Sequence, residues 1–179
     1  MNFVKTGIEG VVIIEPRVFE DERGYFYESF RKDEFARNVT DADFVQDNES
    51  YSKERGEVRG LHFQTGEWAQ AKLVRVVKGM VQDVAVDLRE GSPTFGKYVS
   101  VILSESNKKM LYIPRGFAHG YAVLQPDSVF PYKCDNYYAP DHQGGWRWND
   151  PFFGIKWEVE PSEVILSAKD AAAPLFETR

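Results

Sequence analysis

The sequence contains one cysteine among its 179 residues, and it has no long apolar run. The single thiol, Cys134, excludes an intramolecular disulfide, and we expect it to be a small buried apolar residue rather than a nucleophile. The apolar run near the start, 11–14, is cut by Glu15 and Pro16, which makes it too short for a membrane span or a secretory core segment. We therefore expect a soluble, cytoplasmic protein that makes no membrane contact.

Runs of basic residues are also missing. The chain has 22 Lys and Arg against 28 Asp and Glu, which gives a net charge of -6. Binding to the phosphate backbone of nucleic acid therefore has little support. A local cluster of arginines could still make a positive cleft for a small anionic ligand on an acidic protein.

Short runs of β-branched and aromatic residues fill most of the chain, and few helical signals lie between them. These runs cover 11–14, 45–46, 72–77, 80–88, 97–103, 110–113, 120–124 and 129–134. Many short strands without intervening helices indicate an all-β antiparallel barrel or sandwich, and the length suits one domain over 1–179. Two short helices are expected, over 32–38 and over 167–173, the second with Ser167 as its N-cap.

A histidine and a lysine lie on two neighbouring strand-like segments, His62 within 59–64 and Lys72 within 71–76. Histidine exchanges a proton near neutral pH, and a fixed ammonium stabilises negative charge that develops on a substrate oxygen. The pair therefore suggests proton abstraction beside a carbonyl. For an isolated pair, a hydrogen-bonded barrel histidine and a solvated lysine would be the more ordinary interpretation.

The residues around His62 raise a question of strand geometry. On a regular strand Gln64 shares the face of His62, whereas Arg59 points to the other face. A bulge at Gly60 would turn Arg59 toward the same pocket as His62.

A second histidine, His119, ends the motif Pro-x-Gly-x-x-His that begins at Pro114. This motif resembles the second half of the cupin pattern. In metal-binding cupins the first half supplies a His-x-His pair and a glutamate, whereas here only His62 is present. Two histidines and one carboxylate could still hold a metal, but the missing histidine favours a metal-free pocket.

Segments spread over nearly the whole chain resemble the dTDP-4-dehydrorhamnose 3,5-epimerase family. They are 21–28, 46–50, 59–64, 70–75, 83–89, 116–120, 132–134, 148–151 and 166–170. The resemblance implies a cupin-like jelly-roll barrel (a double-stranded β-helix) with short peripheral helices, and an enzyme that needs no metal or other cofactor. It also implies a homodimer that exchanges N-terminal strands within about 1–50, a barrel core over about 51–160 and the C-terminal helix over about 167–173.

The resemblance further implies a reaction and a role for four residues. The substrate would be dTDP-4-dehydro-6-deoxy-D-glucose, epimerised at both carbons beside the 4-keto group on the route to dTDP-L-rhamnose and cell-surface polysaccharide. His62 would be the base and Asp170 its carboxylate partner. Lys72 would hold the enolate oxygen, and Tyr132 would return a proton from the opposite face of the sugar.

Two of these roles compete with structural alternatives. Asp170 occupies the fourth position of a Ser-x-x-Asp capping box that starts at Ser167. Tyr132 lies in the aromatic strand 129–133, where core packing is the commoner fate. From the residues alone the cap would be favoured for Asp170, whereas the resemblance favours the dyad and an acid role for Tyr132.

Further residues match positions that bind the substrate in the family, although each taken singly is as readily a solvated residue or a structural ion pair. Those expected to meet the diphosphate and the sugar are Arg23, Arg59, His119 and Lys169. Those expected to hydrogen-bond to the nucleoside or the sugar are Glu28, Gln46 and Asn48. Tyr138, in preference to Tyr137, is expected to stack on thymine, and Arg23 and Glu28 would reach the neighbouring subunit's site.

Two positions depart from the family pattern. Gln143 stands where the family often has a glutamate, which replaces a carboxylate contact with an amide. Trp68 stands where proline is usual, so the loop after the His62 strand can differ in shape. Three alternatives remain open at this point: a single-carbon epimerase of a related dTDP-4-keto sugar, a non-catalytic cupin that binds sugar nucleotides, and a metal-dependent cupin oxygenase.

Overall fold

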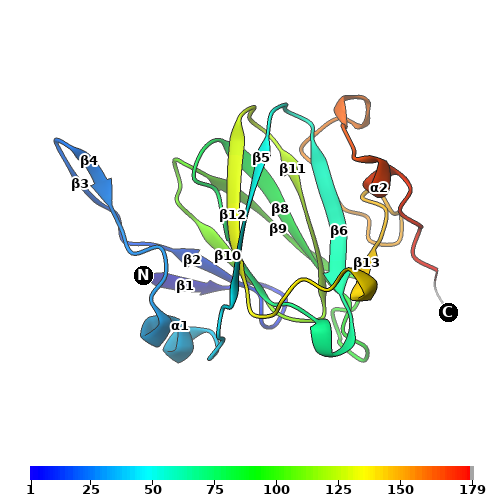
Figure 1. Cartoon of the computed structure of the whole chain (residues 1–179), viewed down its shortest axis with the longest axis horizontal. Helices are drawn as coiled ribbons and strands as arrows, with labels where there is room; N and C mark the ends of the chain where they lie inside the picture. Colours follow the sequence, from blue (N-terminus) through cyan, green and yellow to red (C-terminus); the bar gives the residue numbers. More distant parts are fainter. Residues whose placement is uncertain (178–179) are drawn as a thin grey trace.

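The computed structural model describes residues 1–177, and most of its regular structure is antiparallel β-sheet (Figure 1). The first sheet has six strands in the spatial order β1 (Asn2–Lys5), β2 (Val12–Glu15), β10 (Met110–Ile113), β7 (Lys72–Arg75), β12 (Ser128–Cys134) and β5 (Gln46–Ser52). The second sheet has five strands in the order β13 (Gln143–Gly145), β6 (Val58–Gln64), β11 (Phe117–Val123), β8 (Met80–Asp87) and β9 (Tyr98–Ser104). The two sheets form a jelly-roll barrel, and the all-β prediction is confirmed.

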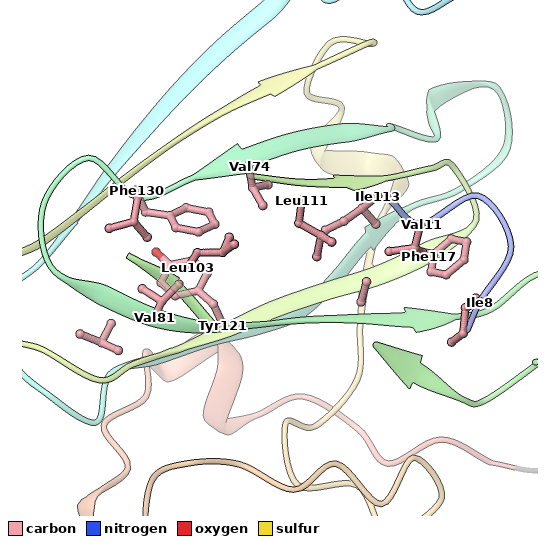
Figure 2. Close-up of a cluster of buried hydrophobic side chains, with 13 residues drawn as sticks. Ile8, Val11, Val74, Val81, Leu103, Leu111, Ile113, Phe117, Tyr121 and Phe130 are labelled. Carbon is pink, nitrogen blue, oxygen red and sulfur yellow. The ribbon is translucent and has the colours of Figure 1, made fainter. Parts of the chain in front are cut away.

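The main hydrophobic core lies between the two sheets (Figure 2). Val74, Leu111 and Phe130 enter it from the six-stranded sheet, where each is at most 1% exposed. Val81 and Leu103 enter it from the five-stranded sheet and are fully buried. Burial of these branched and aromatic side chains, at about 1.5–3 kcal/mol each, provides the main force that holds the sheets together.

Short helices and loops cover the outer faces of both sheets. Helix α1 (Lys32–Asn38) covers the six-stranded sheet, where the Phe35 ring lies 5.2 Å from that of Tyr112. The segment after β13 covers the five-stranded sheet and packs Phe153 against Leu61. This segment contains the 3₁₀ helix η3 (Pro161–Glu163) and helix α2 (Ala168–Ala171), whereas η1 (Gly66–Trp68) and η2 (Pro140–His142) lie in the loops beside β6 and β13.

Most predicted elements agree with the observed ones. The helix predicted over 32–38 is α1, and Ser167 is the N-cap of α2, which ends two residues before the predicted end at 173. The predicted two-residue strand at 45–46 is in fact β5, seven residues long. Its sequence is almost entirely polar, yet its exposed and half-buried residues alternate, so its inward face is polar rather than apolar. No pattern indicated β1, β13, β3 (Phe19–Asp21) or β4 (Gly24–Phe26).

A bulge in β6 sets which of its side chains face the barrel interior. His62 pairs with His119 and Arg59 with Tyr121, so β6 has one more residue than β11 between the two pairs. At the bulge Gly60 has a φ of +122°, and a Cβ there would lie 2.6 Å from the Gly120 Cα. The predicted bulge is therefore present, and it lets Arg59 reach across to Ser52 of the opposite sheet.

One hairpin leaves the body of the domain. Strands β3 (Phe19–Asp21) and β4 (Gly24–Phe26) pair with each other and project away from the barrel (Figure 1). Phe19, Tyr25 and Phe26 are each at least half exposed. In this single chain β1 and β2 join the chain's own sheet, because β2 pairs with β10. No helix within residues 1–177 is both long enough and apolar enough to cross a membrane.

Gly60→Ala should lower the free energy of unfolding in urea by about 3 kcal/mol, because the methyl group would meet the β11 backbone at a φ that favours glycine. Gly7→Ala is the matched control, since a Cβ there meets no atom within 4 Å. Equal stability of the two variants would show that the bulge does not require glycine.

Candidate active site

A cleft of about 260 Å³ between the two sheets gathers most of the predicted site residues. Strands β5, β7 and β12 line it on one side and β6 and β13 on the other. The lining residues are Gln46, Asn48, His62, Phe63, Gln64, Gln70, Lys72, Tyr132, Tyr138 and Gln143. A larger groove of about 640 Å³ lies near Phe95 and Phe176, but its described lining includes no histidine or lysine. The titratable groups therefore point to the smaller cleft as the chemical site.

His62 and Asp170 form a hydrogen-bonded dyad. The His62 Nε2 lies 2.5 Å from the Asp170 Oδ1, and the Asp170 side chain is almost fully buried behind the imidazole. The Ser167 hydroxyl donates to the other oxygen of Asp170 at 2.8 Å and accepts from the Asp170 backbone N–H at 3.1 Å. Asp170 therefore belongs to the helix cap and to the dyad at once, so the two interpretations are compatible.

The charge of Asp170 fixes the tautomer of its partner. Burial alone would raise the pKa of Asp170, but hydrogen bonds from His62 and Ser167 and the charge of Lys169 outweigh burial and lower it. An ionised carboxylate only accepts hydrogen bonds, so the His62 Nε2 carries the shared proton. The Nδ1 atom of the neutral ring then has the lone pair that can act as a base.

Lys72 and Tyr132 come from the sheet opposite His62. In the register between β12 and β7, Cys134 pairs with Lys72 and Tyr132 with Val74. The Lys72 Nζ lies 5.8 Å from the centre of the Tyr132 ring. The cleft therefore has a basic group on one sheet and a cation beside a phenol on the other.

Burial sets the protonation of this second pair. It raises the pKa of Tyr132 to about 12, so the phenol keeps its proton at neutral pH. Burial also lowers the pKa of Lys72, while the nearby charge of Asp83 opposes this shift and favours the ammonium form. A desolvated ammonium interacts more strongly with developing negative charge than a hydrated one does.

A second histidine–carboxylate pair lies in the barrel interior. The His119 Nε2 lies 2.9 Å from the Asp83 Oδ2, and both side chains are buried. Burial lowers the pKa of His119, against the opposing effect of Asp83. His119 lies directly opposite His62 in the strand register. Asp83 was not among the predicted site residues, although Asp83 and Asp87 alternate with apolar residues along one strand.

Asp87 has a different role from Asp83. Its carboxylate accepts hydrogen bonds from Arg89, Ser92 and Thr94, which close the turn after β8. Burial would raise the pKa of Asp87, but these donors hold it well below its ordinary value. Asp87 is therefore a structural carboxylate.

The predicted nucleotide contacts gather at the cleft mouth. The Tyr138 hydroxyl donates to the Gln143 Oε1 at 3.0 Å, and the Lys169 ammonium donates to the same oxygen. The Tyr138 backbone N–H donates to the Gln46 Oε1 at 2.9 Å, and the Gln46 amide donates to Asn48. The Tyr138 side chain remains half exposed, so a planar ring can stack on it.

Besides His119 and Lys169, three more predicted binding residues lie outside the cleft lining. The Arg59 guanidinium donates to the Tyr51 carbonyl oxygen at 2.9 Å. Tyr51 lies on β5, the strand that also contributes residues to the cleft. Arg23 is paired with Asp21 on the projecting hairpin. Glu28 lies beyond that hairpin with a carboxylate oxygen 3.9 Å from Arg31. The single chain therefore does not bring Arg23 and Glu28 to its own cleft.

Neither histidine belongs to a metal-ligand cluster within the described chain. Residues 1–177 hold no group of three or more His, Cys, Asp or Glu side chains placed to bind a metal ion.

Trp68, the departure in the loop after β6, ends η1 and places its ring 5.7 Å from the His142 ring.

An all-β barrel that sets a carboxylate-bound histidine opposite a half-buried lysine and a phenol defines an epimerase of the proton-transfer class. The family model for dTDP-4-dehydrorhamnose 3,5-epimerase matches residues 5–178. A relative of that name from Salmonella typhimurium is 52% identical, over 99% of this chain and 96% of its own length. The chain belongs to the dTDP-4-dehydrorhamnose 3,5-epimerase family, whose activity is isomerisation of a dTDP-linked sugar.

Solved structures agree with this assignment. The crystal structure of dTDP-4-dehydrorhamnose 3,5-epimerase from Elizabethkingia anophelis NUHP1 has a TM-score of 0.93 and 50% identity, over 98% of this chain and 96% of that one. The dTDP-6-deoxy-D-glucose-3,5-epimerase from Legionella pneumophila Philadelphia 1, in complex with dTDP-4-keto-L-rhamnose, has a TM-score of 0.93 and 48% identity. That match covers 97% of this chain and 92% of the Legionella chain.

Asp170→Asn should lower kcat about 10²- to 10⁴-fold, because an amide cannot stabilise the imidazolium that forms when His62 takes a proton. Ser167→Ala is the control that removes the cap and keeps the dyad, with an expected loss of about 1 kcal/mol in stability. Steady-state kinetics and urea unfolding separate the two effects. Wild-type kcat in Asp170→Asn would contradict the role of the dyad.

Proposed function

We propose that this chain epimerises dTDP-4-dehydro-6-deoxy-D-glucose at both carbons beside the 4-keto group, in the synthesis of dTDP-L-rhamnose in the cytoplasm. One observation carries the proposal: His62, held by Asp170, lies in the same cleft as Lys72 and Tyr132 and on the opposite sheet. The names of the relatives, and the ligand of the Legionella neighbour, support the same substrate class.

The first step is removal of a proton from a carbon next to the ketone. The ketone acidifies these protons because the resulting negative charge spreads onto its oxygen. His62 accepts the proton, and the Asp170 carboxylate stabilises the imidazolium that forms. Lys72 stabilises the enolate oxygen in a site partly shielded from water.

The second step returns a proton from the other face of the sugar. Inversion at carbon requires a donor across the ring from the base, and Tyr132 lies on the sheet that faces His62. With its pKa raised to about 12, Tyr132 holds a proton at neutral pH and can give it to a strongly basic enolate. His62 then releases its proton to solvent and Tyr132 takes one from solvent, so that the same pair of groups can act at the second carbon.

The cleft mouth supplies the contacts for the rest of the substrate. Tyr138 stacks on thymine, and Gln143 hydrogen-bonds beside it through an amide that here replaces the usual carboxylate. The sugar and the diphosphate are assigned to Lys169, Arg59 and His119, and the remaining hydrogen bonds to Gln46 and Asn48.

The site is completed by a second copy of the chain. The β3–β4 hairpin carries aromatic side chains away from the barrel, and each of them stays at least half exposed in the single chain. In the proposed homodimer this N-terminal segment crosses to the partner, and Arg23 and Glu28 meet the substrate in the neighbouring cleft.

Incubation of enzyme and substrate in deuterated water tests the reaction directly. Deuterium should enter both carbons beside the ketone, and His62→Ala should abolish exchange at both. Mass spectrometry and proton NMR of the recovered sugar nucleotide locate the label. Full exchange by His62→Ala would remove His62 from the role of base.

The label pattern also separates the alternatives. Label at one carbon only would identify a single-carbon epimerase, and dTDP binding without any exchange would identify a non-catalytic cupin. Stoichiometric iron in the purified protein together with no exchange would favour an oxygenase.

Complementation tests the shared site. Arg23→Ala and His62→Ala should each have little activity, whereas a reassociated mixture should regain about a quarter of wild-type activity, because half the dimers are mixed and each has one intact site. Size-exclusion chromatography and activity assays check this expectation. No regained activity in a mixture shown to contain mixed dimers would contradict a site built from two chains.

A further inference from the structure

Gln64 lies on β6 two residues after His62, and its buried side-chain amide uses three hydrogen bonds. The Nε2 donates to the Trp68 carbonyl oxygen at 2.6 Å and to the Tyr137 carbonyl oxygen at 3.1 Å. The Oε1 accepts from the Ala139 backbone N–H at 2.8 Å. Two acceptors on one side and a donor on the other fix the orientation of the amide.

These partners flank Tyr138. Its backbone neighbours on both sides, Tyr137 and Ala139, are held by the one Gln64 side chain. Other amides complete the arrangement: Gln70 donates to the Asn136 carbonyl oxygen, and the Asn136 amide donates to the Glu67 carbonyl oxygen. Residues 135–139, called the platform loop below, therefore have little regular structure of their own but are held on β6 and on the loop after it.

We propose that Gln64 is a positioning residue for the nucleotide: it fixes the platform loop so that the Tyr138 ring is preorganised for the base. The inference rests on the proposed function, because it takes Tyr138 as the surface on which thymine stacks. A loop that is already ordered loses less conformational entropy when a ligand binds, so the binding free energy is larger. Gln64 thereby couples the strand that carries the base His62 to the loop that carries the nucleotide contact.

The contacts assign Gln64 to binding rather than to proton transfer. Its three hydrogen-bond partners are backbone groups of the loops beside β6, and none of them belongs to His62, Lys72 or Tyr132. The contact to Trp68 uses a backbone oxygen, which any residue at that position supplies. The departure from the family pattern at Trp68 therefore leaves this support intact.

Gln64→Met tests the proposal, because methionine keeps the length of the side chain and removes all three hydrogen bonds. We expect the Kd for dTDP, measured by calorimetry, to rise about tenfold, with a parallel rise in KM and a kcat within about twofold of wild type. Gln64→Glu is a second variant, which keeps an acceptor for Ala139 and should also weaken binding.

Gln82→Met is the matched control. Gln82 is a buried glutamine of the same sheet that also donates to two oxygens and accepts from a backbone N–H, here of Glu158. Its partners lie away from the platform loop, so its loss should lower the melting temperature and leave the dTDP Kd unchanged. A purely structural role for Gln64 predicts the same pattern in Gln64→Met.

A double variant shows whether Gln64 acts through Tyr138. In a Tyr138→Ala background, Gln64→Met should change the dTDP Kd less than about twofold, because the ring that it positions is gone. An unchanged Kd in folded Gln64→Met and Gln64→Glu, or a tenfold rise that persists without Tyr138, would overturn the proposal. Failure of the wild type to bind dTDP or to exchange protons would instead contradict the proposed function itself.

Discussion

The close contact between β6 and β11 at Gly60 is the constraint on which the site depends. A left-handed glycine there absorbs one extra residue, so the side chains on either side of the bulge keep their required faces. Val58 and Leu61 both pack against the segment after β13 that covers the five-stranded sheet, although a regular strand would place them on opposite faces. His62 is then directed into the cleft at the point where α2 presents Asp170. The backbone at Gly60 therefore links the fold to the site. The dyad needs helix α2 as well as the barrel, because α2 carries Asp170.

The two-sheet architecture suits a reaction that must add a proton on the side opposite to its removal. In the proposed mechanism one sheet carries the base and the other carries the phenol and the ammonium, so a sugar ring between them would have a proton acceptor on one face and a donor on the other. Burial serves both groups of the second sheet. It keeps Tyr132 protonated, and it would strengthen the interaction of Lys72 with the enolate oxygen of the proposed mechanism. The polar inner face of β5, with Gln46 and Asn48, gives the same cavity a surface that can hydrogen-bond to the nucleoside and the sugar.

Composition and pattern were enough to predict the all-β class, the α1 helix and most apolar strands, because those elements follow from burial of one face. They were not enough for β5, whose inner face is polar because it lines the cleft rather than the core. Parity alone would have turned Arg59 outward, and only the glycine at 60 indicated the bulge. The dyad partner of His62 is 108 residues away, so no local pattern could join the two. Asp83 was not predicted as the partner of His119, which lies 36 residues along the chain. The three contacts of Gln64 were not predicted either, because they depend on loops that meet only in the folded chain. Roles for Arg23 and Glu28 stay predictions, since the contacts expected of them belong to a second chain.

In the proposed reaction His62 and Tyr132 have different roles: His62 removes the proton, and Tyr132 returns one from the other face. The decisive measurement is the stereochemistry of the sugar recovered from Tyr132→Phe in deuterated water, followed by NMR. With the base intact and the opposing donor removed, His62 should take a proton, exchange it with the deuterated solvent and return a deuteron to the same face. The expected product is therefore labelled sugar with unchanged configuration. Inverted, labelled product formed at the wild-type rate would show that Tyr132 is not the donor. It would also contradict the proposal that the base lies on one sheet and the proton donor on the other.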